Sequence, residues 1–326
     1  MKRAVAISRT AAVSAFGAAT HGLADALAHG TALAGLPDDV PLAQPRALKM
    51  MSRAAYLAAR CLASLRSGRP LEAAGYYLGV GASGGSLDDF MALLAESLVD
   101  GELSLAQFGT RGLAACHPLL AFQLMNNFTL CHGAILEHVS GPNSALFSRG
   151  AGTVAAIAEA VHAVETGECE IAITGGADAP THPATLAELA RDGFVDRGLC
   201  AADAVGLLEL EPAVGNAIVI EGCATASGRG RTVAAAITDA VSRVTRDFDV
   251  IVIAPWGPPA EDALRSFAGA TPIISTRLLG DSLAATPALA LIAAHDLLVH
   301  TPGRALVLSL GVDGDPAAIS VARGPA

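Results

Sequence analysis

The sequence predicts an α/β protein, because short apolar runs with β propensity alternate with alanine-rich helical segments. The apolar runs are nearly continuous, as expected of strands that helices cover on both faces. The alanine-rich segments at residues 46–64, 151–167 and 283–298 are predicted to be helices. The strands are predicted at residues 3–8, 76–83, 143–148, 169–175, 206–211, 217–222, 249–255, 272–276, 305–311 and 318–322.

The order of these elements recurs along the chain. Each part contains a strand, then a strand, turn and helix, and then a further strand. We therefore expect two similar halves, residues 1–211 and 212–326, and the short linker between them predicts that they pack as one compact unit. The corresponding segments are residues 76–83, 143–167 and 169–176 in the first half and 250–255, 272–298 and 305–311 in the second.

Composition predicts a soluble, cytoplasmic protein. Hydrophobic residues make up 52% and charged residues 16% of the chain, but no uncharged apolar run reaches the ~18 residues of a membrane-spanning helix. Lys2 and Arg3 precede an apolar stretch that Arg9 interrupts. This stretch is shorter than the ~7–15-residue core of a signal peptide.

Charge and cysteine spacing exclude several function classes. The net charge of −10 and the lack of a Lys/Arg block argue against a nucleic-acid partner. The six cysteines are scattered without a C-x-x-C pair, and the nine histidines show no metal-ligand spacing. We therefore expect free, mostly buried thiols, no metal and no cofactor.

The segment 127–179 carries the most informative motif. It contains Gly141-Pro142 before a strand, then a turn, a long alanine-rich helix that ends near Gly167, and a strand that ends in Gly175-Gly176-Ala177-Asp178. This segment resembles the core of a β-ketoacyl synthase, a condensing enzyme of fatty-acid and polyketide assembly. Residues 11–32, 79–90, 192–211, 275–294 and 309–315 are similar to other segments of that family, in the same order.

The resemblance implies a thiolase-like fold, in which two similar α/β halves form a five-layered α-β-α-β-α body. It also implies a dimer, because members of the family pair through the strand before their nucleophile. In this chain that strand and the start of its turn are Asn143, Ser144, Ala145, Leu146, Phe147, Ser148 and Arg149.

The catalytic positions of the family are all replaced in this chain. A working synthase uses a cysteine at a helix N-terminus as its nucleophile, with two histidines and a lysine for decarboxylation and charge stabilisation. Here the cysteine position is Gly150, the first histidine is Pro255, the lysine is Arg277 and the second histidine is Asp281, which can exchange with Ser282 in the alignment. We therefore expect no condensing activity, and Ser148 lies two positions too early to substitute.

A silent ketosynthase-like chain resembles the chain-length factor of type II polyketide systems. That resemblance implies pairing with a catalytic ketosynthase, access to an acyl carrier protein through the complex, and control of product length. The chain is shorter than a typical ketosynthase between Asp178 and Gly206 and between Cys223 and Asp249. In this respect it resembles chain-length factors from systems that make reduced or polyene chains. By register, the residues expected along the acyl tunnel are Ser83, Ser86, Phe90, Leu119 and Leu120.

Two alternatives remain open at this stage. A homodimeric, degenerate ketosynthase could act as a scaffold for carrier protein, although the acidic charge disfavours binding of an acidic carrier. An acyltransferase or hydrolase on the same fold would need a nucleophile and base, with Arg149 and Asp281 as the residues left to examine.

Overall fold

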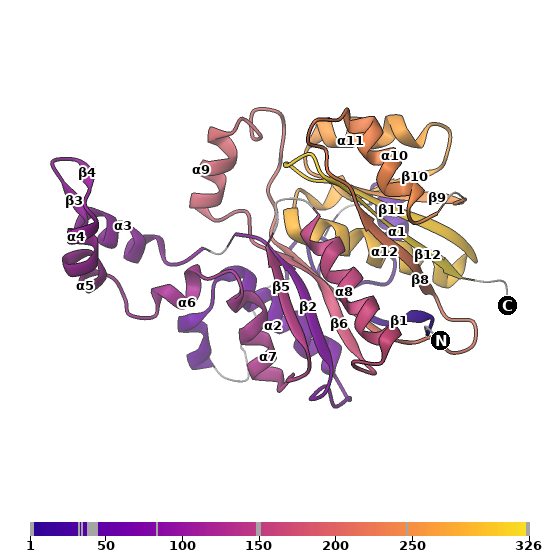
Figure 1. Cartoon of the computed structure of the whole chain (residues 1–326), viewed down its shortest axis with the longest axis horizontal. Coiled ribbons are helices and arrows are strands. Elements are labelled where there is room, and N and C mark those ends of the chain that lie inside the picture. Colours follow the sequence, from indigo (N-terminus) through magenta and orange to yellow (C-terminus); the bar gives the residue numbers. More distant parts are fainter. Residues whose placement is uncertain are drawn as a thin grey trace.

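The computed structural model describes residues 3–31, 33, 35–37, 45–82, 84–147, 151–245 and 247–323. Its main sheet has ten strands in the order β10-β9-β11-β12-β8-β1-β7-β6-β2-β5 (Figure 1). The strands are β1 (Val5–Val13), β2 (Gly75–Val80), β5 (Asn143–Phe147), β6 (Ala172–Asp178), β7 (Ala204–Pro212), β8 (Val219–Thr225), β9 (Val250–Pro255), β10 (Ile273–Ser275), β11 (Gly303–Leu310) and β12 (Pro316–Arg323). All the strands predicted from the sequence are therefore present.

The sheet consists of two equivalent groups of strands. In the first, β2 is parallel to β5 and β6, and β7 is antiparallel to β6 and β1. In the second, β9 is parallel to β10 and β11, and β12 is antiparallel to β11 and β8. The repeated order of elements seen in the sequence is thus a repeated topology. The division at residues 211 and 212 lies between β7 and β8, and we keep it as a proposal.

Helices form three layers around the two groups of strands. The helices of the body are α1 (Leu23–His29), α2 (Arg53–Arg66), α7 (Phe128–Glu137), α8 (Gly152–Thr166), α9 (Pro183–Arg191), α10 (Val233–Ser242), α11 (Pro258–Ala268) and α12 (Thr286–His300), with short 3₁₀ turns η1 (Pro45–Met50), η3 (Thr276–Leu279) and η4 (Leu283–Ala285). Helices α2 and α7 share one apolar cluster with the first group of strands, and α10 and α11 share another with the second. Helices α8 and α12 pack between the groups. The result is the predicted five-layered α-β-α-β-α body.

Strand periodicity explains this layering. Successive side chains of a strand point to opposite faces. In β11, Ala305 and Val307 join the central cluster, whereas Leu306 and Leu308 join the cluster under α10 and α11. Because both faces of the strand are covered, its residues do not alternate between apolar and polar. The strand is therefore a continuous apolar run.

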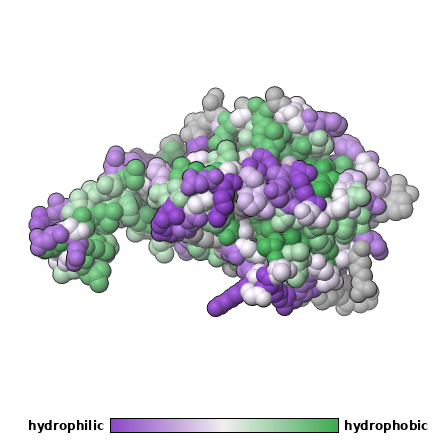
Figure 2. All heavy atoms as spheres, turned by 90° about the horizontal axis from the view of Figure 1, so that it is seen from above, coloured by the Kyte–Doolittle hydropathy of each residue, from purple (hydrophilic) through white to green (hydrophobic). Residues whose placement is uncertain are grey.

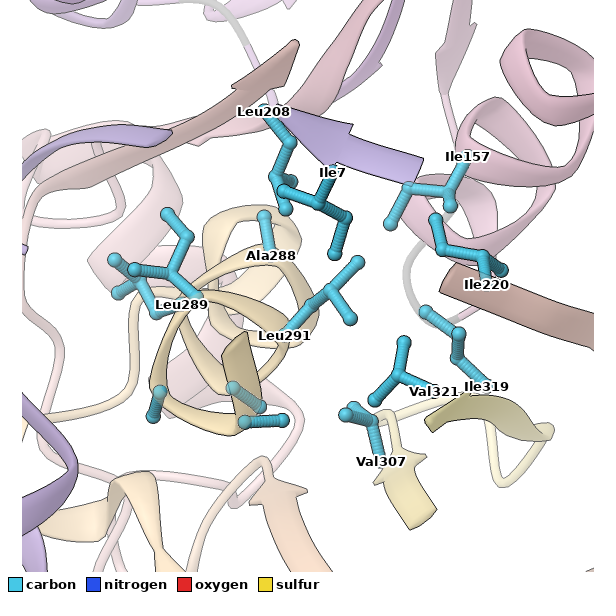
Figure 3. Packing of buried hydrophobic residues seen from close by; sticks show 14 of the residues in the cluster. Ile7, Ile157, Leu208, Ile220, Ala288, Leu289, Leu291, Val307, Ile319 and Val321 are labelled. Carbon is cyan, nitrogen blue, oxygen red and sulfur yellow. The ribbon is translucent and has the colours of Figure 1, made fainter. Parts of the chain in front are cut away.

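Helix α12 is the centre of the core. Ala288 and Leu291 lie beside residues of β1, β7, β11 and β12 (Figure 3). The segment Leu283–His300 is long and apolar enough to cross a membrane, but 78% of it is buried inside the protein. Its hydrophobicity is therefore explained by its position between the two groups of strands.

Local signals set the helix ends. The Ser52 hydroxyl accepts the N–H of Ala55 at 3.2 Å and caps α2. Helix α8 ends at Gly167, whose φ of 77° lies in the left-handed region that glycine adopts without strain. Gly79 in β2 lets α8 approach closely, since a Cβ there would lie 2.0 Å from the Thr153 hydroxyl.

Residues 84–127 form an arm that extends away from the layered body (Figure 1). It contains α3 (Leu87–Ala95), the hairpin β3 (Leu98–Val99) and β4 (Glu102–Leu103), α4 (Leu105–Gln107), the π-helical turn η2 (Phe108–Gly112), α5 (Leu113–Ala115) and α6 (Leu120–Leu124). Ser86 caps the first of these helices, its hydroxyl accepting the N–H of Asp89 at 3.3 Å. The arm was not predicted from the sequence.

Candidate functional site at the strand ends

The C-terminal ends of strands from the two groups lie close together around one small cavity. The parallel strands β2, β5 and β6 end at one edge of their sheet, and the end of β9 from the second half lies against them. A small cavity of about 30 Å³ remains between them. It is lined by Gly81, Ala82, Phe147, Asp178, Thr185, Glu188, Leu189, Trp256, Leu283 and Val312. Trp256 follows Pro255 directly, so the cavity lies beside one of the degenerate positions that the sequence assigned.

Part of the predicted site lies outside the described residues. This holds for Gly150 at the nucleophile position, for Ser148 and Arg149 before it, and for the tunnel candidate Ser83. The structure therefore places three of the predicted catalytic positions, Pro255, Arg277 and Asp281, and these lie close together in the second half.

Asp281 is fully buried, and both oxygens of its carboxylate accept hydrogen bonds. One oxygen accepts the N–H of Gly257 at 2.8 Å, and the other accepts the N–H of Cys200 at 2.7 Å and a guanidinium N–H of Arg277. The Asp281 N–H also donates to the Cys200 carbonyl at 2.6 Å. These hydrogen bonds fix the Asp281 side chain and connect the loops around it.

The ion pair extends from Arg277 to α11. Arg277 Nε lies 3.5 Å from a carboxylate oxygen of Glu261. The other Glu261 oxygen accepts the Ser275 hydroxyl at 2.9 Å and the guanidinium of Arg265 at 2.7 Å. Arg277 and Asp281, which the resemblance assigned to the lysine and second histidine positions, thus belong to one structural charge network.

Trp256 is the residue that sequence reasoning missed. Pro255 closes β9, and the next residue, Trp256, is 4% exposed and lines the cavity. Its indole also lines an adjoining hollow of about 250 Å³ beside α11. The resemblance assigned the first histidine position to Pro255, and a shift of one residue in that alignment would assign it to Trp256. Its Nε1–H has no hydrogen-bond partner among the described residues.

Asp178 is a second buried carboxyl group at the cavity. Burial raises the pKa of Asp178 to about 7, although the N–H groups of Ala284 and Ala179 act in the opposite direction. The Ala284 N–H donates to one oxygen at 3.1 Å, and the other oxygen has no partner among the described residues. A Cβ at Gly81 would lie 1.9 Å from this carboxyl group, so only glycine fits there.

Leu283 completes the wall between Asp178 and Trp256. Its φ of 40° lies in the left-handed region, which is costly for a residue with a branched side chain. Its side chain packs with Leu189, Leu199 and Trp256. Apolar packing therefore leaves a cavity of only about 30 Å³ here, and the packed conformation includes local backbone strain at Leu283.

The tunnel candidates do not gather at this cavity. Ser86 caps α3 and Phe90 lies half-buried on the same helix. Leu119 is half-buried at the start of α6, and Leu120 is 2% exposed and packs near Gly85. None of these four residues lines the 30 Å³ cavity. They lie on the arm, so their assignment to a tunnel remains a proposal.

The strand assigned to the dimer interface is the terminal strand of the sheet. β5 pairs with β2, and no other described strand lies on its far side. Phe147 at its end is 52% exposed. An unpaired edge with an exposed aromatic side chain is a surface that a partner strand can cover.

Comparison with known proteins places the chain in a family. The sequence model described as "Beta-ketoacyl synthase, N-terminal domain" matches residues 44–206, which is half of the chain. The chain belongs to the β-ketoacyl synthase family. No curated protein matches the sequence. The family model ends within β7, and the strands after it repeat the topology of the matched part.

Solved structures show the same fold over nearly the full length. The ishigamide ketosynthase/chain length factor has 19% identity and a TM-score of 0.74, with 99% of this chain and 100% of that chain covered. The type II polyketide synthase complex AntDE:AntF, an acyl-carrier protein with its ketosynthase bound to the hexaketide, has 13% identity, a TM-score of 0.77 and the same coverage. The ketosynthase ApeO in complex with its chain length factor ApeC from Xenorhabdus doucetiae has 17% identity, a TM-score of 0.70, and 99% and 98% coverage.

Proposed function

We propose that this chain is a catalytically silent chain-length factor, which pairs with an active ketosynthase in a type II polyketide synthase. The observation that supports the proposal is the Arg277–Asp281 pair next to Gly257, at the positions that the resemblance assigns to the lysine and second histidine of a synthase. A general base must lie within reach of the substrate. The Asp281 carboxylate is fully buried and accepts hydrogen bonds from Arg277 and two main-chain N–H groups, so it is out of reach of a substrate, and we assign condensation to the partner subunit.

Two surfaces support pairing with another subunit. The first is the unpaired edge of β5, where Phe147 is exposed. The second is the arm, on which apolar atoms extend over much of the surface in Figure 2. An exposed apolar surface of this kind favours burial against a partner. Its exposed apolar side chains are Leu87, Met91, Leu98, Val99, Leu103, Leu105, Leu113, Phe122, Leu124 and Met125.

The charge of the chain favours a division of labour within the complex. The family resemblance implies an acidic acyl carrier protein as a partner of the complex. Like charges across an interface oppose binding. The net charge of −10 therefore favours docking of the carrier on the ketosynthase, with this chain closing the far end of the acyl tunnel. We place this complex in the cytoplasm, and we propose that residues of the arm limit the length of the product.

Co-expression tests the proposal. This chain would be co-expressed with an intact ketosynthase that retains its cysteine and is encoded beside it, with an affinity tag on the ketosynthase only. We expect native mass spectrometry to show a one-to-one complex that condenses malonyl units, and the ketosynthase without this chain to lose that activity. A homodimer of this chain that does not bind the ketosynthase would contradict the proposal. It would favour a homodimeric scaffold for carrier protein, or an acyltransferase or hydrolase activity on the same fold.

A further inference from the structure

The hollow between α1 and α12 gathers potential metal ligands from distant parts of the chain. It has a volume of about 440 Å³ and is lined by α1 and the turn before it, by Ile274 of β10 and by the C-terminal end of α12. Three histidines and two aspartates line it, namely His21, His29, His300, Asp25 and Asp296. Neither the family resemblance nor the proposed function accounts for this concentration of titratable side chains.

Three of these residues have the spacing of a metal-binding group. One ligand atom from each of His21, Asp296 and His300 lies within 4.8 Å of the other two. His21 Nδ1 lies 3.4 Å from Asp296 Oδ1, and the two imidazole rings have centroids 5.5 Å apart. Among the residues that the structure describes, no other group of three such side chains meets this criterion.

The carboxylate of Asp296 is fixed in place before any ion binds. Its oxygens accept the N–H of Gly22 at 3.1 Å and the N–H of Ala24 at 3.0 Å, and the side chain is 9% exposed. These bonds explain Asp296 as a cap of α1. They do not explain why His21, 82% exposed, and His300, the last residue of α12, lie on either side of it. Each carboxylate oxygen retains a second lone pair for a cation.

We propose that His21, Asp296 and His300 bind one divalent transition-metal ion, with Zn²⁺ as the best-matched ion. Two imidazole nitrogens and one carboxylate oxygen form a ligand set that zinc accepts, with water in the fourth tetrahedral position. Zinc bonds of ~2.0–2.1 Å place tetrahedral ligand atoms ~3.4 Å apart. The two exposed imidazoles can turn to this spacing around the fixed carboxylate. The ion would link the turn before α1 to the C-terminal end of α12, and this proposal is independent of the proposed function.

Zinc titration of the purified full-length chain tests the site. Isothermal titration with ZnCl₂ would compare the unchanged chain with His21→Ala and His300→Ala, whose side chains are exposed and whose loss should leave the fold intact. His162→Ala removes an exposed histidine of α8 outside the hollow and is the matched control. A parallel thermal melt with and without ZnCl₂ measures whether the ion stabilises the fold.

We expect one zinc ion per chain, an increase in melting temperature on adding it, and the same behaviour in His162→Ala. His21→Ala and His300→Ala should each bind zinc at least ten-fold more weakly and lose the increase in melting temperature. Absence of binding to the unchanged chain would overturn the proposal. Equal binding by all four proteins would also overturn it, because the ion would then be held elsewhere, for example by the exposed thiol of Cys200.

Discussion

The guanidinium of Arg277 donates to the buried carboxylate of Asp281, four residues later in the chain. The same carboxylate accepts main-chain N–H groups from Cys200 and Gly257, which belong to two other segments. The Asp281 side chain therefore connects the loop before β7, the start of α11 and the turn after β10. The Arg277–Asp281 pair thus has a structural role.

Replacing Asp281 with alanine should destabilise the chain strongly. The change leaves the guanidinium of Arg277 and the N–H groups of Cys200 and Gly257 without their shared acceptor. Breaking a buried ion pair by removing one partner costs about 3–5 kcal/mol. Chemical denaturation of the full-length chain, or of its complex, would measure the free energy of unfolding.

Asp262→Ala is the control for this prediction. Asp262 is exposed on α11, close in sequence to Glu261, and its side chain forms no ion pair that the structure describes. We expect its replacement to change the free energy of unfolding by less than about 0.5 kcal/mol. Equal effects of the two substitutions would show that the Asp281 network contributes nothing specific to the fold.

Asp178 should make the stability of the chain depend on pH. Its pKa rises from an ordinary 3.8 to about 7 because the carboxyl group is buried. Between these values the folded state keeps a proton that the unfolded state has lost, so stability falls as pH rises. The stabilisation is complete below pH 3.8 and is lost as pH passes 7. The slope between these limits approaches about 1.4 kcal/mol per pH unit.

Asp178→Asn isolates this effect, because asparagine has nearly the same shape as a protonated aspartic acid and does not titrate. Other carboxyl groups titrate in both proteins, so the measured quantity is the difference in free energy of unfolding between them. We expect the variant to gain stability relative to the unchanged chain as pH rises from 5 to 8. A difference that stays constant over this range would mean that Asp178 is already ionised in the folded protein.

The strands were predictable because a strand that is buried on both faces is a continuous apolar run in the sequence. Strands covered on both faces, such as β9 and β11, are continuous apolar runs whose limits the sequence located within a few residues. β1 was predicted to end at residue 8 because Arg9 interrupts the apolar run. The strand continues to Val13 past an irregularity between Ile7 and Arg9, and Arg9 donates to the Leu65 and Ser67 carbonyls instead of facing the core.

The contents of the site were harder to predict, because they depend on contacts between distant segments. The alignment assigned Arg277 and Asp281 to one site but did not predict their ion pair, and the N–H donors of Cys200 and Gly257 come from elsewhere in the chain. Trp256 lines the cavity, but it was missed because the alignment assigned the preceding residue, Pro255, to the histidine position. The arm lacks a regular apolar period because its helices are short and many of its apolar side chains face solvent.

Phe147→Asp should prevent pairing with the ketosynthase. Phe147 is 52% exposed at the end of the unpaired β5 edge, so a partner strand would bury it. Burying an unpaired carboxylate at an interface costs several kcal/mol. We expect the tagged ketosynthase to retain less than a tenth of the usual amount of this chain on co-purification.

Val214→Asp provides the comparison for Phe147→Asp. Val214 is 83% exposed in the connection between β7 and β8, away from the β5 edge in the strand order. The same introduced charge should leave co-purification unchanged there. Loss of pairing in both variants, or in neither, would refute the assignment of β5 to the interface.

Phe90→Ala should lengthen the polyketide that the complex makes. An acyl chain gains ~0.8 kcal/mol for each buried CH₂ group, so elongation continues until a bulky side chain blocks the tunnel. Phe90 is half-buried on α3, within the arm that we propose to contact the partner. Mass spectrometry of the products would measure the length distribution, with Phe267→Ala, a half-buried phenylalanine of α11 outside the arm, as the control. If Phe90 lies in the tunnel, Phe90→Ala should give products at least one extension unit longer, and the control variant should not. A change in yield without a change in length would mean that another residue sets the length.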